Sequence, residues 1–152
     1  MCREEAQEAF SHIDEFKAAG ASRVVALVKE NVGTEVEDFR KGYWPGDILM
    51  DKEQEFYKAL GGGSPHKPFS GLASFLAMLL NPFATRGTKQ NLARCKAKKV
   101  DGNITGEGFV AGGCYVLRRD GTAAFSFLEK ELGDHAKVQD ILAALREATK
   151  PE

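Results

Sequence analysis

The sequence predicts an α/β fold in which helices cover both faces of a sheet. Helical and strand-like patterns alternate in the first part of the chain, and a hairpin followed by a helix closes it. Strands that alternate with helices favour a sheet that is covered on both sides. The 152 residues suit a single domain, 1–152, with one core, because no linker is long enough to divide the chain.

The first helix is predicted to begin at residue 2. Its apolar residues recur at helical spacing along one stripe: Cys2, Ala6, Ala9, Phe10, Ile13 and Phe16. Glutamates fill the first turns, where the helix dipole favours negative charge, and Gly20 is expected to end the helix. Neither a capping residue nor a strand precedes this stripe. A helix that starts in this way is typical of the middle of a domain rather than of its beginning.

Two strands are expected next. Residues 23–28 form an apolar, β-branched run after the arginine, which is typical of a strand covered on both faces. Residues 47–50 predict a second short buried strand. Two strands alone make a thin sheet for the helices to cover, so the pattern suggests that a strand upstream of Met1 is absent.

Two short helices are expected around the second strand. Thr34 stands three residues before Glu37, which is a capping-box pattern for a helix that contains Val36 and Phe39. Asp51, with Gln54 at the capping-box position, is predicted to begin a helix over residues 52–60. The glycines of residues 61–63 end it.

The middle of the chain predicts a helical insertion at about residues 65–100. Residues 69–80 form an apolar helix candidate, and residues 86–99 contain six basic residues and no acidic one. We interpret this segment as a helix that packs over the sheet and carries a solvated basic tail. The alternative is contact with a membrane surface through residues 69–99.

The last third predicts a hairpin and a closing helix. Residues 114–118 and 122–128 flank Arg119-Asp120-Gly121, a turn sequence that tolerates the required backbone conformation. Asp134 is expected to cap the final helix, in which Val138, Ile141, Leu142 and Leu145 form one apolar stripe.

The composition excludes several classes of protein. The 21 basic and 22 acidic residues give a net charge of −1, whereas nucleic-acid binders usually carry a basic excess. No run reaches the roughly 18 apolar residues of a membrane-spanning helix, and the charged residues 1–8 do not resemble a signal peptide. Three cysteines, an odd number, argue against a disulfide scaffold. We expect a cytoplasmic protein with no nucleic-acid partner.

An ordered set of short motifs resembles the peroxiredoxin-like 2 family, which includes selenoprotein U and, more distantly, prostamide/prostaglandin F synthase. The set spans about residues 2–145 and consists of Cys2-Arg3-Glu4-Glu5-Ala6, Val25-Ala26-Leu27-Val28-Lys29-Glu30, Thr34-Glu35-Val36, Asp38-Phe39, Asp51-Lys52-Glu53, Phe56-Tyr57, Gly102-Asn103, Gly106-Glu107-Gly108-Phe109, Gly112-Gly113, Glu129-Lys130-Glu131 and Gly133-Asp134.

The resemblance implies a thioredoxin-like three-layer α/β/α sandwich that is truncated at its N-terminus. It also implies redox chemistry at a Cys-x-x-Cys motif, in which the first residue is selenocysteine in several members. Cys2 matches the second residue of this motif. The first residue and the strand before it would lie upstream of Met1, and a selenocysteine codon read as a stop would explain such a chain.

The implied function is that of a thiol- or selenol-dependent oxidoreductase of the peroxiredoxin-like antioxidant type. It would reduce peroxides or disulfides, with electrons from thioredoxin, glutathione or an NADPH-linked reductant and no bound cofactor. A narrower alternative is a prostaglandin F synthase-like endoperoxide reductase. The other alternative is a non-catalytic thioredoxin-like regulatory or binding module, and we expect the chain alone, with Cys2 as its catalytic residue, to be inactive.

The three cysteines differ in their expected roles. Cys2, at a helix N-terminus, is the best-placed reactive thiol, because backbone N–H groups stabilise a thiolate there. Cys114 opens a strand and is expected to be a core residue, and Cys95, among basic residues, is expected to be incidental. None has metal-site spacing with a histidine, and no set of Glu, Asp and His elsewhere indicates a catalytic site.

Residues 111–113 depart from the patterns of related redox proteins. Thioredoxins place a cis-proline about here, and peroxiredoxins place a peroxide-binding arginine nearby, but the chain has Ala111-Gly112-Gly113. Peroxiredoxin-style activation of a peroxide is therefore not indicated by this segment. The two glycines permit close packing or a bulge.

Overall fold

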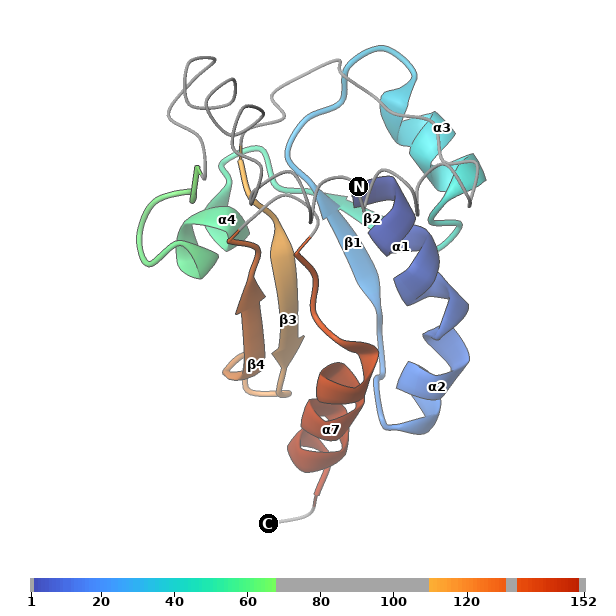
Figure 1. The fold of residues 1–152 in the computed structure, drawn as a ribbon, viewed down its shortest axis with the longest axis vertical. Helices are drawn as coiled ribbons and strands as arrows, with labels where there is room; N and C mark the ends of the chain where they lie inside the picture. Colours follow the sequence, from blue (N-terminus) through green and yellow to red (C-terminus); the bar gives the residue numbers. More distant parts are fainter. Residues whose placement is uncertain (1, 68–109, 131–133, 151–152) are drawn as a thin grey trace, which may run out of the picture.

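A computed structural model describes residues 2–67, 110–130 and 134–150, and Figure 1 shows their arrangement. The described part is a mixed α/β fold, which confirms the predicted α/β class. Its elements, in chain order, are α1 (Cys2–Ser11), α2 (Ile13–Ala18), β1 (Val25–Val28), α3 (Glu35–Gly42), β2 (Asp47–Met50), α4 (Glu55–Leu60), β3 (Gly113–Leu117), β4 (Ala123–Leu128) and α7 (Val138–Ala148). The predicted insertion, from residue 68 onward, and Cys95 lie outside the described residues.

The described strands form two separate two-stranded sheets. β1 pairs with β2 in parallel, with Val25 opposite Asp47 and Val28 opposite Met50. β3 pairs with β4 in antiparallel fashion, from Gly113 opposite Leu128 to a bulge at Leu117. β1 and β3 point in opposite directions (Figure 1). Within the described residues, no strand joins the two sheets.

The first predicted helix is divided into α1 and α2. The break falls at His12, directly after Ser11, whose hydroxyl donates to the Glu8 carbonyl at 2.6 Å. Such a side-chain bond competes with the helical backbone pattern. Gly20, at φ 108°, ends α2 as predicted. The Gly20 N–H donates to Lys17 and the Ala21 N–H to Phe16, which is a Schellman motif.

The capping box predicted for α3 does not form. The helix begins just after Thr34, as expected, but the Thr34 hydroxyl donates to the Asp38 carboxylate at 2.8 Å instead of capping a backbone N–H. Glu37 pairs with Lys41 on the exposed face, 2.6 Å away, so it does not reach back to the start of the helix. The predicted start is right, and the predicted contacts are wrong.

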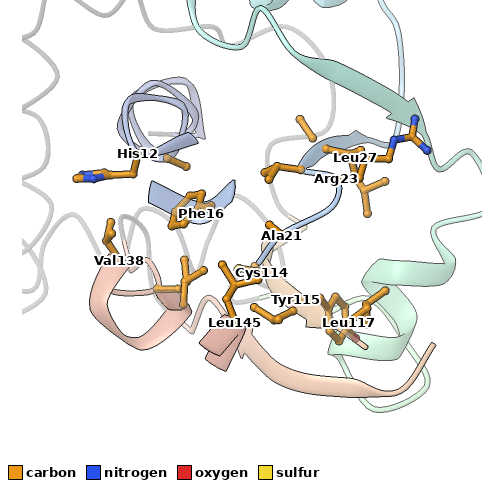
Figure 2. A pocket seen from close by; sticks show the side chains of 18 of the residues that line it. His12, Phe16, Ala21, Arg23, Leu27, Cys114, Tyr115, Leu117, Val138 and Leu145 are labelled. Atoms are coloured by element: carbon orange, nitrogen blue, oxygen red, sulfur yellow. The ribbon is translucent and has the colours of Figure 1, made fainter. Parts of the chain in front are cut away.

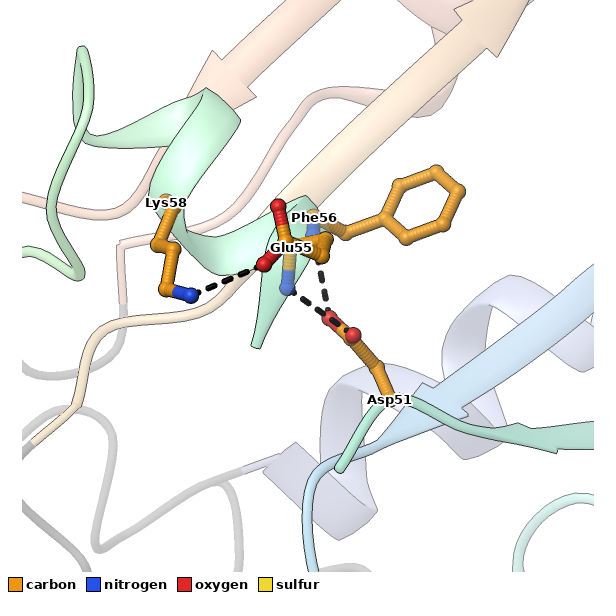
Figure 3. A network of polar contacts seen from close by, with 4 residues as sticks. All are labelled: Asp51, Glu55, Phe56 and Lys58. Atoms are coloured by element: carbon orange, nitrogen blue, oxygen red, sulfur yellow. Dashed lines mark hydrogen bonds and ion pairs between the residues drawn. The ribbon is translucent and has the colours of Figure 1, made fainter. Parts of the chain in front are cut away.

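Asp51 caps α4, although the helix begins later than predicted. Its carboxylate accepts hydrogen bonds from the N–H groups of Glu55, at 2.9 Å, and Phe56, at 3.0 Å (Figure 3). Gln54 has a left-handed backbone, φ 57°, and makes no side-chain cap, so α4 begins only at Glu55. Lys58 then pairs with Glu55 at 2.8 Å on the same helix.

The hairpin is where the sequence places it, and the closing helix begins later than predicted. Gly121, at φ 86°, completes the turn, and the Asp120 carboxylate accepts bonds from the backbone N–H and hydroxyl of Thr122 at 2.9 and 2.7 Å. The cap predicted at Asp134 is wrong. α7 begins at Val138 after Lys137, and Asp134 instead accepts a bond from the Lys130 N–H at 3.3 Å.

The core of the described residues is small. Its buried apolar residues are Phe16, Trp44, Ala111, Val116, Ala136 and Leu142. Trp44 packs edge-on against Phe10, with ring centroids 5.3 Å apart, and donates to the Asp47 carbonyl at 2.9 Å. Among the described helices, none has the length and apolar character needed to cross a membrane.

β2 is exposed, contrary to the prediction of a buried strand. Leu49 and Met50 are 41% and 39% exposed. The reason is that β2 lies at an edge, with β1 as its partner among the described strands. An apolar run alone does not distinguish an edge strand from a central one.

Candidate functional site

A cleft of about 1380 Å³ lies between β1 and β3. Its walls come from both sheets and from the helices that flank them. Figure 2 shows Phe16 of α2 and Leu145 of α7 near Cys114, with Leu27 of β1 and Tyr115 of β3 farther along. The volume exceeds the roughly 300–1,000 Å³ of ordinary small-molecule pockets. The space therefore suits a segment of chain better than a compact ligand.

The β1 edge faces this cleft with its backbone. The Val28 carbonyl accepts a hydrogen bond from the Asp51 N–H at 2.8 Å, so Val28 points toward the β2 side. Because backbone groups alternate along a strand, those of Leu27 point the other way, into the cleft. The Tyr57 hydroxyl confirms this direction, because it donates to the Leu27 carbonyl at 3.3 Å.

The β3 edge faces the same cleft. The Gly112 carbonyl accepts a hydrogen bond from the Glu129 N–H at 3.1 Å, which places the Gly112 backbone on the side of β4. By the same alternation, Gly113 and Tyr115 turn their backbone groups away from β4, toward β1. The cleft is thus bordered on two sides by strand edges.

Cys2 is the first residue of α1, as the sequence predicts. Its backbone lies in the first helical turn, with Glu4 and Glu5 after it. The placement of its side chain lies outside what the structure describes, so its reactivity stays a prediction. α1 contains ten residues, which is long enough for the dipole of its N-terminus to favour a thiolate.

Cys114 has the character of a packing residue. It lies in β3, half-buried, facing the cleft. Burial raises the pKa of its thiol to about 11, and the negative charge of Glu5 adds to the shift. The thiol is therefore neutral and weakly nucleophilic at physiological pH. Cys114 is less buried than the core residue predicted at this position.

Two carboxyl groups that the sequence analysis overlooked come together near the start of α1. The side chains of Glu5 and Glu129 lie close enough to influence each other's pKa. Burial, followed by the charge of Glu129, raises the pKa of Glu5 to about 8, and burial also raises the pKa of Glu129. The two residues are 124 positions apart, and only the fold brings them together.

Gly112 and Gly113 occupy positions where a side chain would approach neighbouring atoms too closely. A Cβ at Gly113 would lie 2.0 Å from the Phe127 carbonyl oxygen, which no side chain could tolerate. A Cβ at Gly112 would lie 3.0 Å from Glu129 Oε1. The interpretation of these glycines as sites of close packing is confirmed. In the described ranges, no three His, Cys, Asp or Glu residues are grouped as a metal site would require.

Comparisons with known proteins agree on one relationship. The family model described as AhpC/TSA antioxidant enzyme matches residues 10–131. Peroxiredoxin-like 2A of Danio rerio is 35% identical over 147 residues, which cover 96% of this chain and 62% of that protein. The Gallus gallus protein of the same name is 36% identical over 154 residues, covering 100% and 61%.

A second group of relatives is more distant. Prostamide/prostaglandin F synthase of Sus scrofa is 32% identical over 124 residues, which cover 81% of this chain and 56% of that protein. The chain spans about three fifths of the length of the first curated relatives it matches. No solved structure matches the chain.

Proposed function

The chain belongs to the AhpC/TSA antioxidant enzyme family, and on this basis we propose that it is a thiol- or selenol-dependent oxidoreductase of the peroxiredoxin-like type. The homology to peroxiredoxin-like 2A over nearly the whole chain confirms the resemblance found in the sequence. Within the proposal, Cys2 is the second residue of a Cys-x-x-Cys motif, or of one that begins with selenocysteine. The observation that carries it is family membership together with Cys2 at the start of α1.

The proposed reaction has three steps. The thiolate or selenolate of the first motif residue attacks the peroxide oxygen, takes up one oxygen atom and releases an alcohol or water. The Cys2 thiol then attacks this oxidised residue, which forms a disulfide or selenenylsulfide and releases water. A dithiol or thiol reductant, such as thioredoxin or glutathione, returns two electrons and two protons. Disulfide substrates would enter by the same exchange chemistry.

The proposal includes one further strand, which would precede α1 and carry the first motif residue. Two features of the fold support it. The edges of β1 and β3 both face the cleft, which has room for a chain segment. Moreover, parallel neighbours are normally joined through a helix, and α1 and α2 lead into β1 as the second half of such a unit. A strand parallel to β1 and antiparallel to β3 would join the two sheets.

The test uses the protein translated from its complete transcript, read in frame through any UGA codon. A Cys or selenocysteine codon three positions before Cys2, behind an apolar strand, is the expected finding. Peroxide consumption is then measured through NADPH oxidation with thioredoxin and thioredoxin reductase. We expect Cys2→Ser to lower turnover by about a hundredfold or more. Cys114→Ser is the matched control and should retain activity, because that thiol is neutral.

Two other functions remain as distinct outcomes. Equal turnover by the Cys2→Ser variant and the wild type, or no thiol-dependent turnover with any common reductant, would favour a non-catalytic regulatory or binding module. Reduction of a prostaglandin endoperoxide but not of hydrogen peroxide would favour the narrower activity, which the name of the Sus scrofa relative motivates. A cytoplasmic location and electron supply by the thioredoxin or glutathione system are part of the main proposal.

A further inference from the structure

Arg3 connects the start of α1 to both ends of α3. Its guanidinium donates to the Glu35 carboxylate at 2.5 Å, and the central carbon of the guanidinium lies 5.2 Å from the centre of the Tyr43 ring. Glu35 is the first residue of α3, and Tyr43 directly follows the last one. The side chains of Arg3 and Glu35 are 18% and 31% exposed, so this ion pair is partly shielded from water.

The rest of α3 is weakly anchored. The structure describes every residue of this helix, and none of them is buried. Segments with few buried apolar contacts are those that open most easily. α3 has only eight residues, and an isolated helix shorter than about 12–15 residues is marginal in water. The helix therefore depends on its contacts with α1, and it should melt when they are released.

Both connections of α3 are suited to act as hinges. Gly33, two residues before the helix, has a left-handed backbone, φ 58°, and open space where a Cβ would lie. Gly42, the last residue of the helix, also has open space at this position. Beyond it, Trp44 is 4% exposed and packs against Phe10 of α1. Hinge motions are absorbed by a few residues at the ends of elements. α3 has such residues on both sides, and Trp44 is a fixed point after the second.

We propose that α3 is a cap over the first turn of α1 and that Arg3 is the latch that keeps this cap closed. Figure 1 shows α3 beside α1, at the end of the fold toward which β1 points. Phe39 of α3 also lines the cleft, so opening of the cap widens the cleft at this end. The cap thereby controls access to the region where α1 begins. This role goes beyond the proposed oxidoreductase function and does not depend on it.

Hydrogen exchange of the full-length protein, followed by mass spectrometry, tests the latch. The relevant amides run from Asp38, which donates to the Thr34 carbonyl, to Tyr43, which donates to the Phe39 carbonyl. Their exchange rate reports the fraction of molecules in which α3 is open. Arg3→Gln removes both the charge and the guanidinium that stacks on the ring. Exchange in α3 should therefore become about tenfold faster in this variant.

Two further variants divide the latch into its parts. Arg3→Lys keeps the charge but loses the planar guanidinium, and we expect exchange in α3 to become about threefold faster. Glu35→Gln keeps the arginine and removes its carboxylate partner, so its effect should be of similar size, about threefold. If Arg3→Gln and Glu35→Gln both exchange at the wild-type rate, Arg3 is not a latch and the proposal is wrong.

Two control variants separate a latch from a general effect on stability. Arg23→Gln removes the same charge from an exposed pair with Asp47, 2.9 Å away, and should leave exchange in α3 within about twofold of the wild type. Leu142→Ala loosens the core and should speed exchange in α7 but not in α3, because the cap opens by itself. Equal acceleration of α3 and α7, in Leu142→Ala or in Arg3→Gln, would mean that α3 opens only with the whole fold and would overturn the proposal.

Trypsin provides a second measurement of the same opening. Arg40 and Lys41 are exposed on α3, but trypsin cleaves after them only when the helix has unfolded locally. Cleavage at these two residues should be about tenfold faster in Arg3→Gln than in the wild type, and unchanged in Arg23→Gln. Equal cleavage of Arg3→Gln and the wild type would contradict the latch. Neither measurement requires turnover, so a failure of the proposed oxidoreductase function would be seen separately.

Discussion

Glu5 beside the cleft interacts with Glu129, and Glu37 on α3 pairs with Lys41, but the two glutamates lie in different surroundings. Glu5 is half-buried beside Glu129, and burial, followed by the charge of Glu129, raises its pKa to about 8. Glu37 on α3 pairs with Lys41 in the open, where the two side chains are 63% and 70% exposed. Partial burial disfavours the charged form of Glu5, whereas Glu37 lies largely in water. Burial, rather than the presence of a partner, makes a carboxyl group a candidate for proton chemistry.

The largest contrast in stability should come from two leucines. Leu142 of α7 is 4% exposed, whereas Leu117 at the end of β3 is 48% exposed. Leu142→Ala should lower the free energy of unfolding by about 3 kcal/mol, because it leaves a cavity in a small core. Leu117→Ala should cost less than about 1 kcal/mol. Urea denaturation of both variants measures the difference, and equal costs would contradict the described core.

Two glycines allow a crowded position to be compared with an open one. Gly113→Ala forces a Cβ against the Phe127 carbonyl and should destabilise the protein by about 2 kcal/mol. Gly42, at the end of α3, has open space at its Cβ position. Gly42→Ala should be neutral or stabilising by up to about 1 kcal/mol. If both substitutions shift the thermal midpoint in the same direction, the close approach of β3 and β4 is wrong.

The sequence predicts these regions to different degrees, for physical reasons. Local signals were sufficient for the hairpin, where Asp120 and Gly121 determine the turn, and for the end of α2 at Gly20. The exposure of β2 could not be predicted, because it depends on which strands lie beside it. The Glu5–Glu129 pair could not be predicted either, since nothing near Glu5 in the sequence points to a residue 124 positions away.

The predicted helix caps were also right in one case and wrong in others. Asp51 was identified as a cap because it follows a strand, and its carboxylate does accept two backbone N–H bonds. Thr34 looked equally suitable, yet its hydroxyl bonds a side chain, and Asp134 looked suitable but precedes α7 by four residues. A capping residue type is a local feature, but the rotamer that completes the cap depends on competing neighbours.

Two of these residues provide the next prediction. Asp51→Ala removes both cap bonds of α4 and should lower the free energy of unfolding by about 1 kcal/mol. Thr34→Ala removes a hydroxyl that caps no N–H, so it should cost clearly less. Thermal denaturation of the two variants makes the comparison. A larger loss for Thr34→Ala would mean that the Thr34 hydroxyl does cap α3.

The smallest effect should come from the exposed ion pair of α3. Lys41 and Glu37 approach to 2.6 Å, but both side chains are largely in water, where holding two long chains together offsets most of the attraction. Lys41→Ala should therefore change the free energy of unfolding by about 0.5 kcal/mol or less, and added salt should reduce the difference further. Denaturation at low and high salt measures this change. A loss comparable to that of Leu142→Ala would mean that α3 is buried against a part of the protein that the described residues do not include. The contrast between Glu5 and the exposed Glu37 would then be wrong.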